Sequence, residues 1–424
     1  MTPEIKQRIE QIRRGEVPEG YVKKRKVVIP QQWGLPQIKD IASISSGSTP
    51  NRNNSEYWNG NIAWVTTGEL SSGHVNHTSE LITVKAVKET KMRIYPQGTL
   101  LMAMYGQGKT RGTVAILEID AAVNQACAAI TVKDGKSKFL FYQLKNSYQD
   151  IRKLSNTGNQ DNLNADIIKT YQVPWAPDEE QERISTILTT QDKVIELKEK
   201  RLAEKQRQKK YLMQQLLTGK KRLPGFSGEW KNIKLCEVLS ERKEKNVEQN
   251  LRICSVAVQK GVVDQVEHLG RSYAANDTSN YSVAHYGDII YTKSPTGDFL
   301  YGIVKQNLLQ ETVAVSPLYG VFTPLTFGLG YFLHTYFQSA ICARNYLLPI
   351  VQKGAKNTIN ITNDTFISSK LYLPLDVEEQ KAIADTFIAA DREIELLQQD
   401  IEQEKQKKKA LMQLLLTGIV RVKT

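Results

Sequence analysis

The sequence predicts a mixed α/β protein of the α+β class, with two domains and two long helices that form an intramolecular antiparallel coiled coil with pseudo-two-fold symmetry. Three observations predict it: a long internal repeat, a heptad of apolar residues inside each copy, and short β-like runs before each copy. Residues 179–222 and 378–421 align without a gap at an offset of 199, since Gln181 matches Gln380 and Gly219 matches Gly418. This period is much longer than that of a solenoid repeat, so we infer that a whole domain with its helix has been duplicated.

The composition favours a soluble protein with a polyanionic partner. The 424 residues suffice for two domains with separate cores, and the formal net charge is +12. Nucleic acid is the natural partner of a basic protein of this size, and a basic surface that only aids solubility is the alternative. No apolar run is long enough to span a membrane, and the N-terminus lacks a signal-peptide core. We therefore expect a protein of the bacterial or archaeal cytoplasm with no membrane partner.

The first half of the chain is expected to hold an N-terminal segment, one domain and one long helix. Residues 1–16 predict a helix, because Thr2 can cap it and Pro3 suits its first turn. Residues 138–154 predict a second helix. The β-like runs are 62–66, 99–104, 113–119 and 128–132. The expected segments are an N-terminal helix and basic stretch at 1–29, a domain at 30–177 and a helical region at 178–222.

The second half repeats this design. A cluster of Pro and Gly at 224–228 marks a linker, and Trp230 then opens a segment as Trp33 opens the first one. The ends match as well, since Val173-Pro174 and Leu373-Pro374 precede the two long helices. Between these matching starts and ends, the residues of the two segments differ greatly. We therefore expect the ends of the domains and the long helices to be repeated, but not the interiors of the domains. The expected segments are a domain at 223–376 and a helical region at 377–424.

Both predicted long helices carry apolar residues on a seven-residue grid. A sustained heptad predicts a left-handed coiled coil, and two similar helices in one chain are the obvious partners. The alternative is two amphipathic helices that each pack on their own domain. The seam residues are Leu188, Ile195, Leu202, Leu212 and Leu216 in the first helix and Phe387, Ile394, Ile401, Leu411 and Leu415 in the second.

The length of these helices suggests a spacer. A helix of about 39 residues is roughly 58 Å long. Two such helices paired antiparallel would hold their domains at opposite ends in inverted orientation, which matches the dyad of duplex DNA. Half-sites one helical turn apart are about 34–36 Å from each other, so the pair is long enough. Both seams turn basic at the same place, at Lys209 and Lys408.

Several segments together carry a resemblance to a known family. They are Pro174…Glu180-Gln181 and Pro374…Glu379-Gln380 at the helix starts, the LMQ-x-LLTG helix ends, and Gly47-Ser48-Thr49-Pro50…Tyr57-Trp58…Gly60…Ile62-Ala63-Trp64-Val65-Thr66 in the first domain. With these the chain resembles the specificity (S) subunit of type I restriction–modification systems over nearly its whole length. The second domain departs from the first, because Ser240-Glu241-Arg242-Lys243 stands where the Gly47–Pro50 turn would be.

The resemblance implies a DNA-recognition subunit without catalytic activity. Its two target-recognition domains would each read half of a split site in double-stranded DNA, with the helices as a fixed ruler. The helical regions would dock two methyltransferase subunits, and restriction motor–nuclease subunits would join the complex. S-adenosylmethionine, ATP and magnesium would belong to these partners, and no cofactor is expected in this chain.

The residues themselves show no credible catalytic set. Gly108-Lys109-Thr110 ends like a phosphate-binding loop, but Ala103 occupies the place of the required upstream glycine and a strand follows. Asp376, Glu379 and Lys381 imitate a nuclease set, yet they lie at a helix start, where acidic residues stabilise the free N–H groups. The chain has no Asn/Asp-Pro-Pro-aromatic string, which argues against an adenine methyltransferase.

No metal site or disulfide framework is expected either. His74 and His77 lie close in sequence but lack a third ligand nearby, so an exposed loop is expected rather than zinc. The four cysteines are scattered without C-x-x-C spacing, which suits a reducing compartment.

Polar loops that bear glycine remain as candidates for DNA contacts. Arg and Lys can pair with guanine, and Asn or Gln with adenine, in the major groove. Ordinary solvated turns are the alternative, and some lysines would touch phosphate only. The candidates in the first domain are Ser48, Thr49, Asn51, Arg52, Asn53, Gln107, Lys109, Thr110, Arg111, Asn159, Gln160 and Asn162. Those in the second domain are Lys293, Ser294, Thr296, Lys353, Lys356 and Asn357.

Two other functions stay open. One is a self-contained DNA modification or restriction enzyme, which the missing methyltransferase and nuclease motifs argue against. The other is a coiled-coil tether that binds DNA without sequence preference. Equal affinity for specific and scrambled duplexes would favour the tether.

Overall fold

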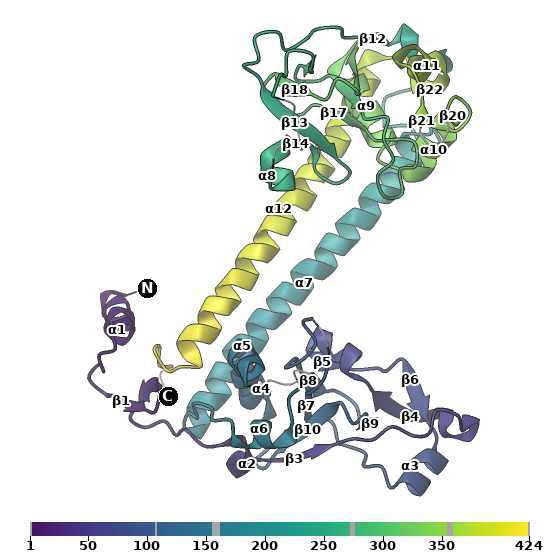
Figure 1. Ribbon diagram of the computed structural model, residues 1–424. Coiled ribbons are helices and arrows are strands. Elements are labelled where there is room, and N and C mark those ends of the chain that lie inside the picture. The colour runs from purple at the N-terminus through teal and green to yellow at the C-terminus, as the bar shows by residue number, and fades with distance from the viewer. Residues whose placement is uncertain (1, 107, 155–161, 272–275, 354–358, 423–424) are drawn as a thin grey trace. The chain divides into compact units, whose positions relative to one another are not determined.

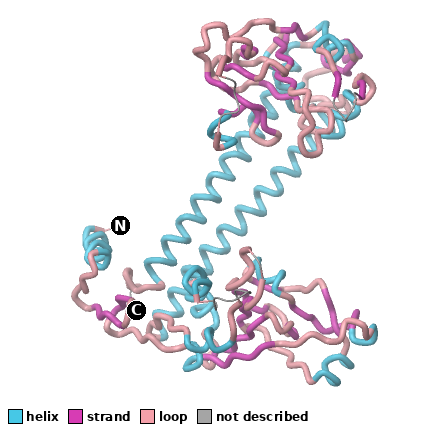
Figure 2. The backbone as a smooth tube through the Cα atoms, in the orientation of Figure 1, coloured by secondary structure: helices cyan, strands magenta, loops and turns pink. Residues whose placement is uncertain are grey.

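The computed structural model describes residues 2–106, 108–154, 162–271, 276–353 and 359–422 and divides into two compact units (Figure 1). Unit 1 consists of Met1–Lys198 and Asp400–Thr424, and unit 2 of Glu199–Gln399. Each unit contains one domain of strands and loops together with part of both long helices (Figure 2). These helices are α7 (Asp178–Leu216) and α12 (Val377–Leu415), each of 39 residues, as the sequence predicts.

The domain of unit 1 is built on a five-stranded sheet in the order β3-β10-β7-β8-β5. Its central strands are buried on both faces. In β7, Leu100 and Met102 belong to one apolar core while Leu101 and Ala103 belong to another, because successive side chains of a strand point to opposite faces. The strands are β3 (Ala42–Ser46), β5 (His74–Val75), β7 (Leu100–Ala103), β8 (Val114–Leu117) and β10 (Cys127–Val132).

A three-stranded sheet, a hairpin and short helices complete unit 1. The sheet has the order β6-β4-β9 and the hairpin is β1-β2. The strands are β1 (Tyr21–Lys24), β2 (Val27–Pro30), β4 (Trp58–Val65), β6 (Glu80–Ile82) and β9 (Ala121–Val123). The helices are α1 (Pro3–Arg13), α2 (Ile38–Ile41), α3 (Val84–Thr90), α4 (Ser137–Asn146), α5 (Tyr148–Lys153) and α6 (Ala165–Thr170).

The predicted elements of the first domain are confirmed with one exception. Strands β4, β7, β8 and β10 lie on the four predicted runs, and α1 lies within residues 1–16. The single helix predicted at 138–154 is wrong, because the chain forms α4 and α5 there. Ser147 separates them with φ −86° and ψ 5°, outside the α-helical region. Residues 139–144 are all buried, whereas α5 buries only Ile151, so the chain changes direction where it leaves the core.

The domain of unit 2 contains two four-stranded sheets, in the orders β12-β19-β16-β17 and β14-β13-β18-β15. Ile289 and Tyr291 of β16 face one core and Ile290 faces the other, as in the central strands of unit 1. The strands of the first sheet are β12 (Leu239–Glu241), β16 (Ile289–Tyr291), β17 (Val304–Gln306) and β19 (Gly320–Pro324). Those of the second are β13 (Arg252–Ala257), β14 (Gly261–Asp264), β15 (Ser282–Ala284) and β18 (Val313–Val315).

Besides the long helices, the described residues of unit 2 also form two strand pairs, four α-helices and a 3-10 helix at Leu235–Glu237. The strand pairs are antiparallel: β11 (Trp230–Lys234) with β22 (Lys370–Pro374), and β20 (Gln352–Lys353) with β21 (Ile359–Asn360). The helices are α8 (Gln265–Leu269), α9 (Phe327–Tyr336), α10 (Ala340–Leu347) and α11 (Asn363–Ser368).

The two domains share more than the sequence predicts. The order β3-β10-β7-β8 in unit 1 corresponds to β12-β19-β16-β17 in unit 2, and α4 packs on β8 as α9 packs on β17. The start and end of each domain also pair, through bridges Gly34–Trp175 and Gln37–Gln172 in unit 1 and through β11–β22 in unit 2. The expectation that the interiors do not repeat is therefore wrong for the backbone. Side chains diverged while the order of the core strands was kept.

The two long helices run antiparallel within each unit. In unit 1, the Lys198 amine bonds to Asp400 Oδ1 (2.8 Å) while Asp192, earlier in α7, bonds to Lys408, later in α12. In unit 2, Lys205 pairs with Glu393 (2.9 Å). None of the helices in the described part of the chain combines the length and the apolar character that a membrane span needs.

Candidate nucleic-acid interface

The loop after β3 makes a close backbone contact with the turn between β9 and β10. The Ser48 N–H donates to the Val123 carbonyl oxygen (3.0 Å), and the Thr49 hydroxyl bonds to the Gln125 side chain. Gly47 is required at the entry to this loop, because a Cβ there would lie 1.8 Å from the Val123 carbonyl oxygen. The predicted turn is therefore held against the sheet at its first residues.

The loop after β7 and the described residues just before α6 reach the same turn through Met104. Its N–H donates to the Ala126 carbonyl (2.8 Å), and its own carbonyl accepts from the Leu163 N–H (3.0 Å). The loop after β7 and the segment before α6 therefore lie beside the loop after β3, although the three are far apart in sequence. Asn162 is half-buried next to Leu163. Gln107, Asn159 and Gln160 lie outside the described residues.

Arg52 is held on two tryptophans. Its guanidinium carbon lies 4.0 Å from the ring centroid of Trp58 and 4.9 Å from that of Trp64, and both terminal nitrogens bond to the Glu80 carboxylate, one at 3.0 Å. This hydrogen bonding lowers the pKa of Glu80 and raises the pKa of Arg52, so both groups are charged at neutral pH. The Arg52 side chain is nevertheless 53% exposed.

The same tryptophans shape the loop that carries Arg52. The Trp58 indole N–H donates to the Asn51 carbonyl (3.2 Å), and the Trp64 indole N–H donates to the Ser48 carbonyl (3.1 Å). The two rings meet edge to face, with centroids 5.2 Å apart. Asn51 in turn accepts the Asn53 N–H (3.0 Å). Sequence reasoning did not assign these rings or the acidic partner of Arg52 to the site; only the tryptophans had a signal, as part of the family motif.

The loop after β7 is anchored by α5. The Tyr148 hydroxyl donates to the Lys109 carbonyl (2.6 Å), and Arg152 donates to the carbonyls of Gly108 and Arg111 (both 2.8 Å). These bonds use only backbone acceptors, so the loop is fixed while its side chains remain at its surface. The Lys109 side chain is exposed, and those of Thr110 and Arg111 are half-buried.

In unit 2 the predicted residues fall in two places. Lys293 lies two residues after the end of β16 and has φ +54°. Burial lowers the pKa of its amine, and the charge of Glu241 opposes this. Ser294 and Thr296 are exposed in the same loop. Lys353 ends β20. Lys356 and Asn357 lie outside the described residues.

The position that replaces the Gly47–Pro50 turn in unit 2 has a structural role. Arg242 donates to both oxygens of the buried Asp288 (2.6 and 3.2 Å) and to the Thr323 hydroxyl (2.8 Å). The loop after β12 thus uses its arginine inside the domain, whereas Arg52 lies at a surface. The same strand order presents different side chains in the two units.

A buried glutamate marks the start of α7. Glu180 is fully buried and accepts from Arg421 at both carboxylate oxygens (2.7 and 2.9 Å) and from the Trp33 indole N–H (2.9 Å). The end of the chain, the entry of the domain and the start of the long helix are therefore joined in unit 1. We name this contact the clamp.

Unit 2 repeats the clamp at Glu379. This carboxylate is fully buried, accepts from two nitrogens of Arg222, and accepts from the Trp230 indole N–H (3.1 Å). Asp376 caps α12, since its carboxylate accepts the N–H two residues on (2.9 Å), as predicted. Capping is the wrong explanation for Glu379, because its charge is neutralised by Arg222. Lys381 is exposed, so the nuclease-like set is structural.

A second repeated contact explains why both seams turn basic. In unit 1 the Asp192 carboxylate bonds to Lys408 and accepts from the Tyr142 hydroxyl (2.7 Å). The equivalent set in unit 2 consists of Asp391, Lys209 and Tyr331, with a hydroxyl–carboxylate distance of 2.9 Å. The lysines therefore pair with the facing helix instead of lying free in the seam.

The predicted seam residues divide between the domain cores and the helix pair. Leu188, Leu411 and Leu415 pack in the core of unit 1, and Leu212, Leu216 and Phe387 pack in that of unit 2. Ile195 and Ile401 are buried outside these cores, and Leu202 and Ile394 are half-buried. The two arrangements weighed from the sequence thus coexist: the helix ends pack on domains and the middle positions face the other helix.

The described residues contain no group of three or more His, Cys, Asp and Glu that could hold a metal ion. His74 bonds to Glu118 (2.8 Å) and His77 to its neighbour Asn76 (2.6 Å). The strand β8 follows Gly108-Lys109-Thr110, where a phosphate-binding loop would lead into a helix. The arrangement offers hydrogen-bond donors and cations at a surface, which suits binding of a polyanion.

Comparisons with known proteins agree with this description. The family model described as "Type I restriction modification DNA specificity domain" matches residues 30–206 and 228–406. The chain is 34% identical over 178 residues to the MjaIX specificity subunit of Methanocaldococcus jannaschii. This aligned region covers 41% of the present chain and 40% of that relative. It is 24% identical to the MjaVIII specificity subunit of the same organism, covering 93% of this chain and 94% of the relative.

Solved structures share the fold. The S subunit of a type I restriction–modification system from M. genitalium matches with a TM-score of 0.58 and 11% identity, covering 93% of this chain and 98% of that one. A chain from a structural study of complex assembly and conformational transition of the type I R-M system matches with a TM-score of 0.54 and 14% identity, covering 92% and 99%.

Proposed function

The chain belongs to the type I restriction modification DNA specificity family, and we propose on this premise that each of its domains reads one half of a bipartite site in double-stranded DNA. The repeated order of the core strands supports two recognition domains of one origin. The different loops on these sheets, with Arg52 exposed in one and Arg242 half-buried against Asp288 in the other, support two different half-sites.

The observation that carries the DNA-reading role is that two polar loops of unit 1, after β3 and after β7, lie beside each other at the turn between β9 and β10. Arg52 presents a guanidinium held by two rings and a carboxylate, and such a group can donate two hydrogen bonds to guanine O6 and N7. Lys109 and Arg111 lie in the neighbouring loop, where they can reach base edges or phosphates.

We assign the role of spacer to α7 and α12. The support is their equal length of 39 residues and their antiparallel contacts within each unit. We further propose that two methyltransferase subunits dock on the helical regions and that restriction motor–nuclease subunits join them. In this proposal the chain is not an enzyme, and S-adenosylmethionine, ATP and magnesium act in the partner subunits of a cytoplasmic complex.

The test uses the chain assembled with its methyltransferase subunits. Mapping methylated adenines in the host genome would define the site, and binding would then be measured on that duplex and on a scrambled one at the same salt concentration. We expect a preference of at least about 10³-fold, typical of specific DNA-binding proteins. Equal affinities would favour a tether without sequence preference. Methylation by the purified chain alone would favour a self-contained enzyme.

A further inference from the structure

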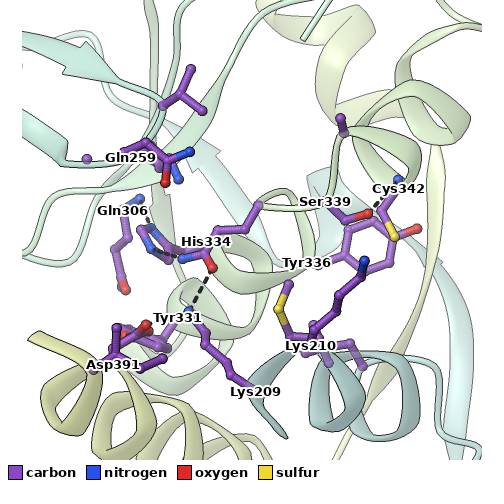
Figure 3. A pocket seen from close by; sticks show the side chains of 18 of the residues that line it. Lys209, Lys210, Gln259, Gln306, Tyr331, His334, Tyr336, Ser339, Cys342 and Asp391 are labelled. Atoms are coloured by element: carbon purple, nitrogen blue, oxygen red, sulfur yellow. Dashed lines mark hydrogen bonds and ion pairs between the residues drawn. The ribbon is translucent and has the colours of Figure 1, made fainter. Parts of the chain in front are cut away.

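A large cavity in unit 2 has no part in the function proposed above. It measures about 1460 Å³ and is lined by residues of α7, α9, α10 and α12 that all belong to this unit. Figure 3 shows Lys209, His334 and Asp391 on one side of the cavity and Tyr336 and Cys342 on the other. Five lysines line it, against two aspartates and one glutamate.

Lys305 is the residue of the cavity that most needs a partner. It lies on β17, its side chain lines the cavity, and only 3% of the residue is exposed. No hydrogen bond or ion pair joins its amine to a described residue. Burial and, to a smaller extent, the charge of Lys209 lower the pKa of Lys305 to about 8, against the opposing charge of Asp391. At neutral pH a buried ammonium group therefore faces the cavity.

The carboxylate whose charge acts on Lys305, that of Asp391, is already engaged. Asp391 is 33% exposed, pairs with Lys209 and accepts from the Tyr331 hydroxyl (2.9 Å). The buried ammonium group of Lys305 therefore has no ion pair with a described residue. A buried charge of this kind is costly unless a counter-ion neutralises it.

Hydrogen-bond donors are also in excess at this point. The His334 Nδ1 accepts from the Gln306 N–H (3.0 Å), so in the neutral ring Nε2 carries the proton. Burial holds the pKa of His334 well below its usual value, which keeps the ring neutral. His334 Nε2 lies 2.9 Å from the Gln338 amide nitrogen, while the Gln338 carbonyl oxygen accepts from Lys209 (2.9 Å). Two N–H donors therefore face each other, and the one carbonyl oxygen of Gln338 is already used by Lys209.

We propose that this cavity binds a phosphate group, with Lys305 and Lys209 neutralising its charge and His334 Nε2 donating a hydrogen bond. A phosphate offers several acceptor oxygens and up to two negative charges, which a carboxylate does not. The cavity is far larger than the ion, so the phosphate belongs to a larger molecule. Two sources share this chemistry: a free nucleotide and the backbone of a DNA duplex.

The test compares Lys305→Met with the wild-type full chain. Methionine is apolar and close to lysine in volume, so the variant is expected to fold at least as stably as the wild type. Lys381→Met is the matched control, since it removes one exposed charge from α12 in the same unit. Thermal unfolding is followed with pyrophosphate, with ATP without magnesium, and with chloride at equal ionic strength. At a ligand concentration a hundred times Kd, we expect a rise in Tm of roughly 5 °C for the wild type and Lys381→Met, and none for Lys305→Met.

The outcomes separate the two sources. A rise with pyrophosphate or ATP identifies a free phosphate compound. If only duplex DNA is bound, Lys305→Met should weaken specific and scrambled duplexes equally and reduce the salt slope by about one. Since the ratio of the two affinities stays unchanged in that case, the result is distinct from a failure of sequence recognition. An equal response of Lys305→Met and wild type to every probe overturns the proposal. A second result would also overturn the proposal. If only the methyltransferase subunits stabilise the wild-type chain, and Lys305→Met loses this stabilisation, the partner of Lys305 is a carboxylate of the methyltransferase.

Discussion

Glu180 and Arg52 are both charged side chains of unit 1 with well-defined partners, but one is buried and the other lies at the surface. Glu180 is fully buried, and Arg421 with the Trp33 indole N–H neutralises and solvates its carboxylate. Loss of one partner of such a buried pair typically costs about 3–5 kcal/mol, because the remaining charge stays in the interior. Arg52 is equally well held, by two rings and the Glu80 carboxylate, but it lies at the surface. Because the pair with Glu80 is exposed, it is expected to contribute little to stability.

The first prediction at this scale concerns Arg52. In the complex with methyltransferase subunits, Arg52→Met should reduce affinity for the specific duplex by roughly 10- to 100-fold, because a bidentate contact to guanine is worth about 1–3 kcal/mol. Affinity for the scrambled duplex should change little. Lys85→Met is the control, since it removes one exposed charge from α3 in the same domain. Equal losses on both duplexes would assign Arg52 to a phosphate instead.

Among the elements, α5 has a function that its length does not suggest. Its six residues supply the Tyr148 and Arg152 bonds to the backbone of the loop after β7. The break at Ser147 is what directs α5 toward this loop, since a continuous helix from residue 138 would extend along the axis of α4.

Removal of the bonds from α5 to this loop should lower the affinity for the specific duplex more than the free energy of unfolding. Arg152→Met deletes both bonds to loop carbonyls, so the loop loses order and the specific duplex should bind roughly 10-fold more weakly. Lys153→Met on the same helix should have no effect, because Lys153 is exposed and pairs only with Asp150. Fluorescence anisotropy with the specific duplex and urea unfolding would measure the two effects. Equal loss of stability and affinity would contradict an anchoring role.

At the scale of the whole molecule, the duplication makes the contacts reciprocal. Glu180 and Glu379, like Asp192 and Asp391, stand 199 residues apart, and each contacts residues near the end of the other long helix. Unit 1 is therefore made from two segments that are far apart in the sequence, whereas unit 2 is the continuous segment Glu199–Gln399. Unit 1 needs the end of α12, and unit 2 needs the end of α7, to complete its clamp.

The spacer role leads to a prediction about the gap in the DNA site. Insertion of seven residues after Leu202 and seven after Ile401 keeps the apolar seam in phase and lengthens both helices by about 10.5 Å. The tolerated gap between half-sites should then increase by about three base pairs. Mapping of methylated sites in a strain that carries the variant would measure it. The control is insertion into α7 alone, which should break the register of the pair. An unchanged gap in the double variant would contradict the spacer role.

Much of this organisation can be read from the residues. The offset between Gln181 and Gln380 predicts the duplication, the heptads predict both helices, and the alternation of apolar runs predicts four strands of unit 1. These signals depend on neighbouring residues or on regular spacing, so they can be recognised in a single sequence. The common strand order of the two interiors could not be predicted, because a backbone topology can be kept while nearly every side chain changes.

The sequence by itself determined the duplication, the two long helices and the basic, glycine-bearing loops, because each depends on spacing along the chain. Only the tertiary structure decided which charges are buried and which are presented. Glu379 and its partner Arg222 are 157 residues apart in the sequence, and Arg52 and its partner Glu80 are 28 residues apart. Whether an arginine closes a clamp, as Arg222 does, or lies on two tryptophans at a surface, as Arg52 does, depends on what the fold brings beside it. Burial and partner choice are properties of packing, so no pattern in the residues alone could assign them.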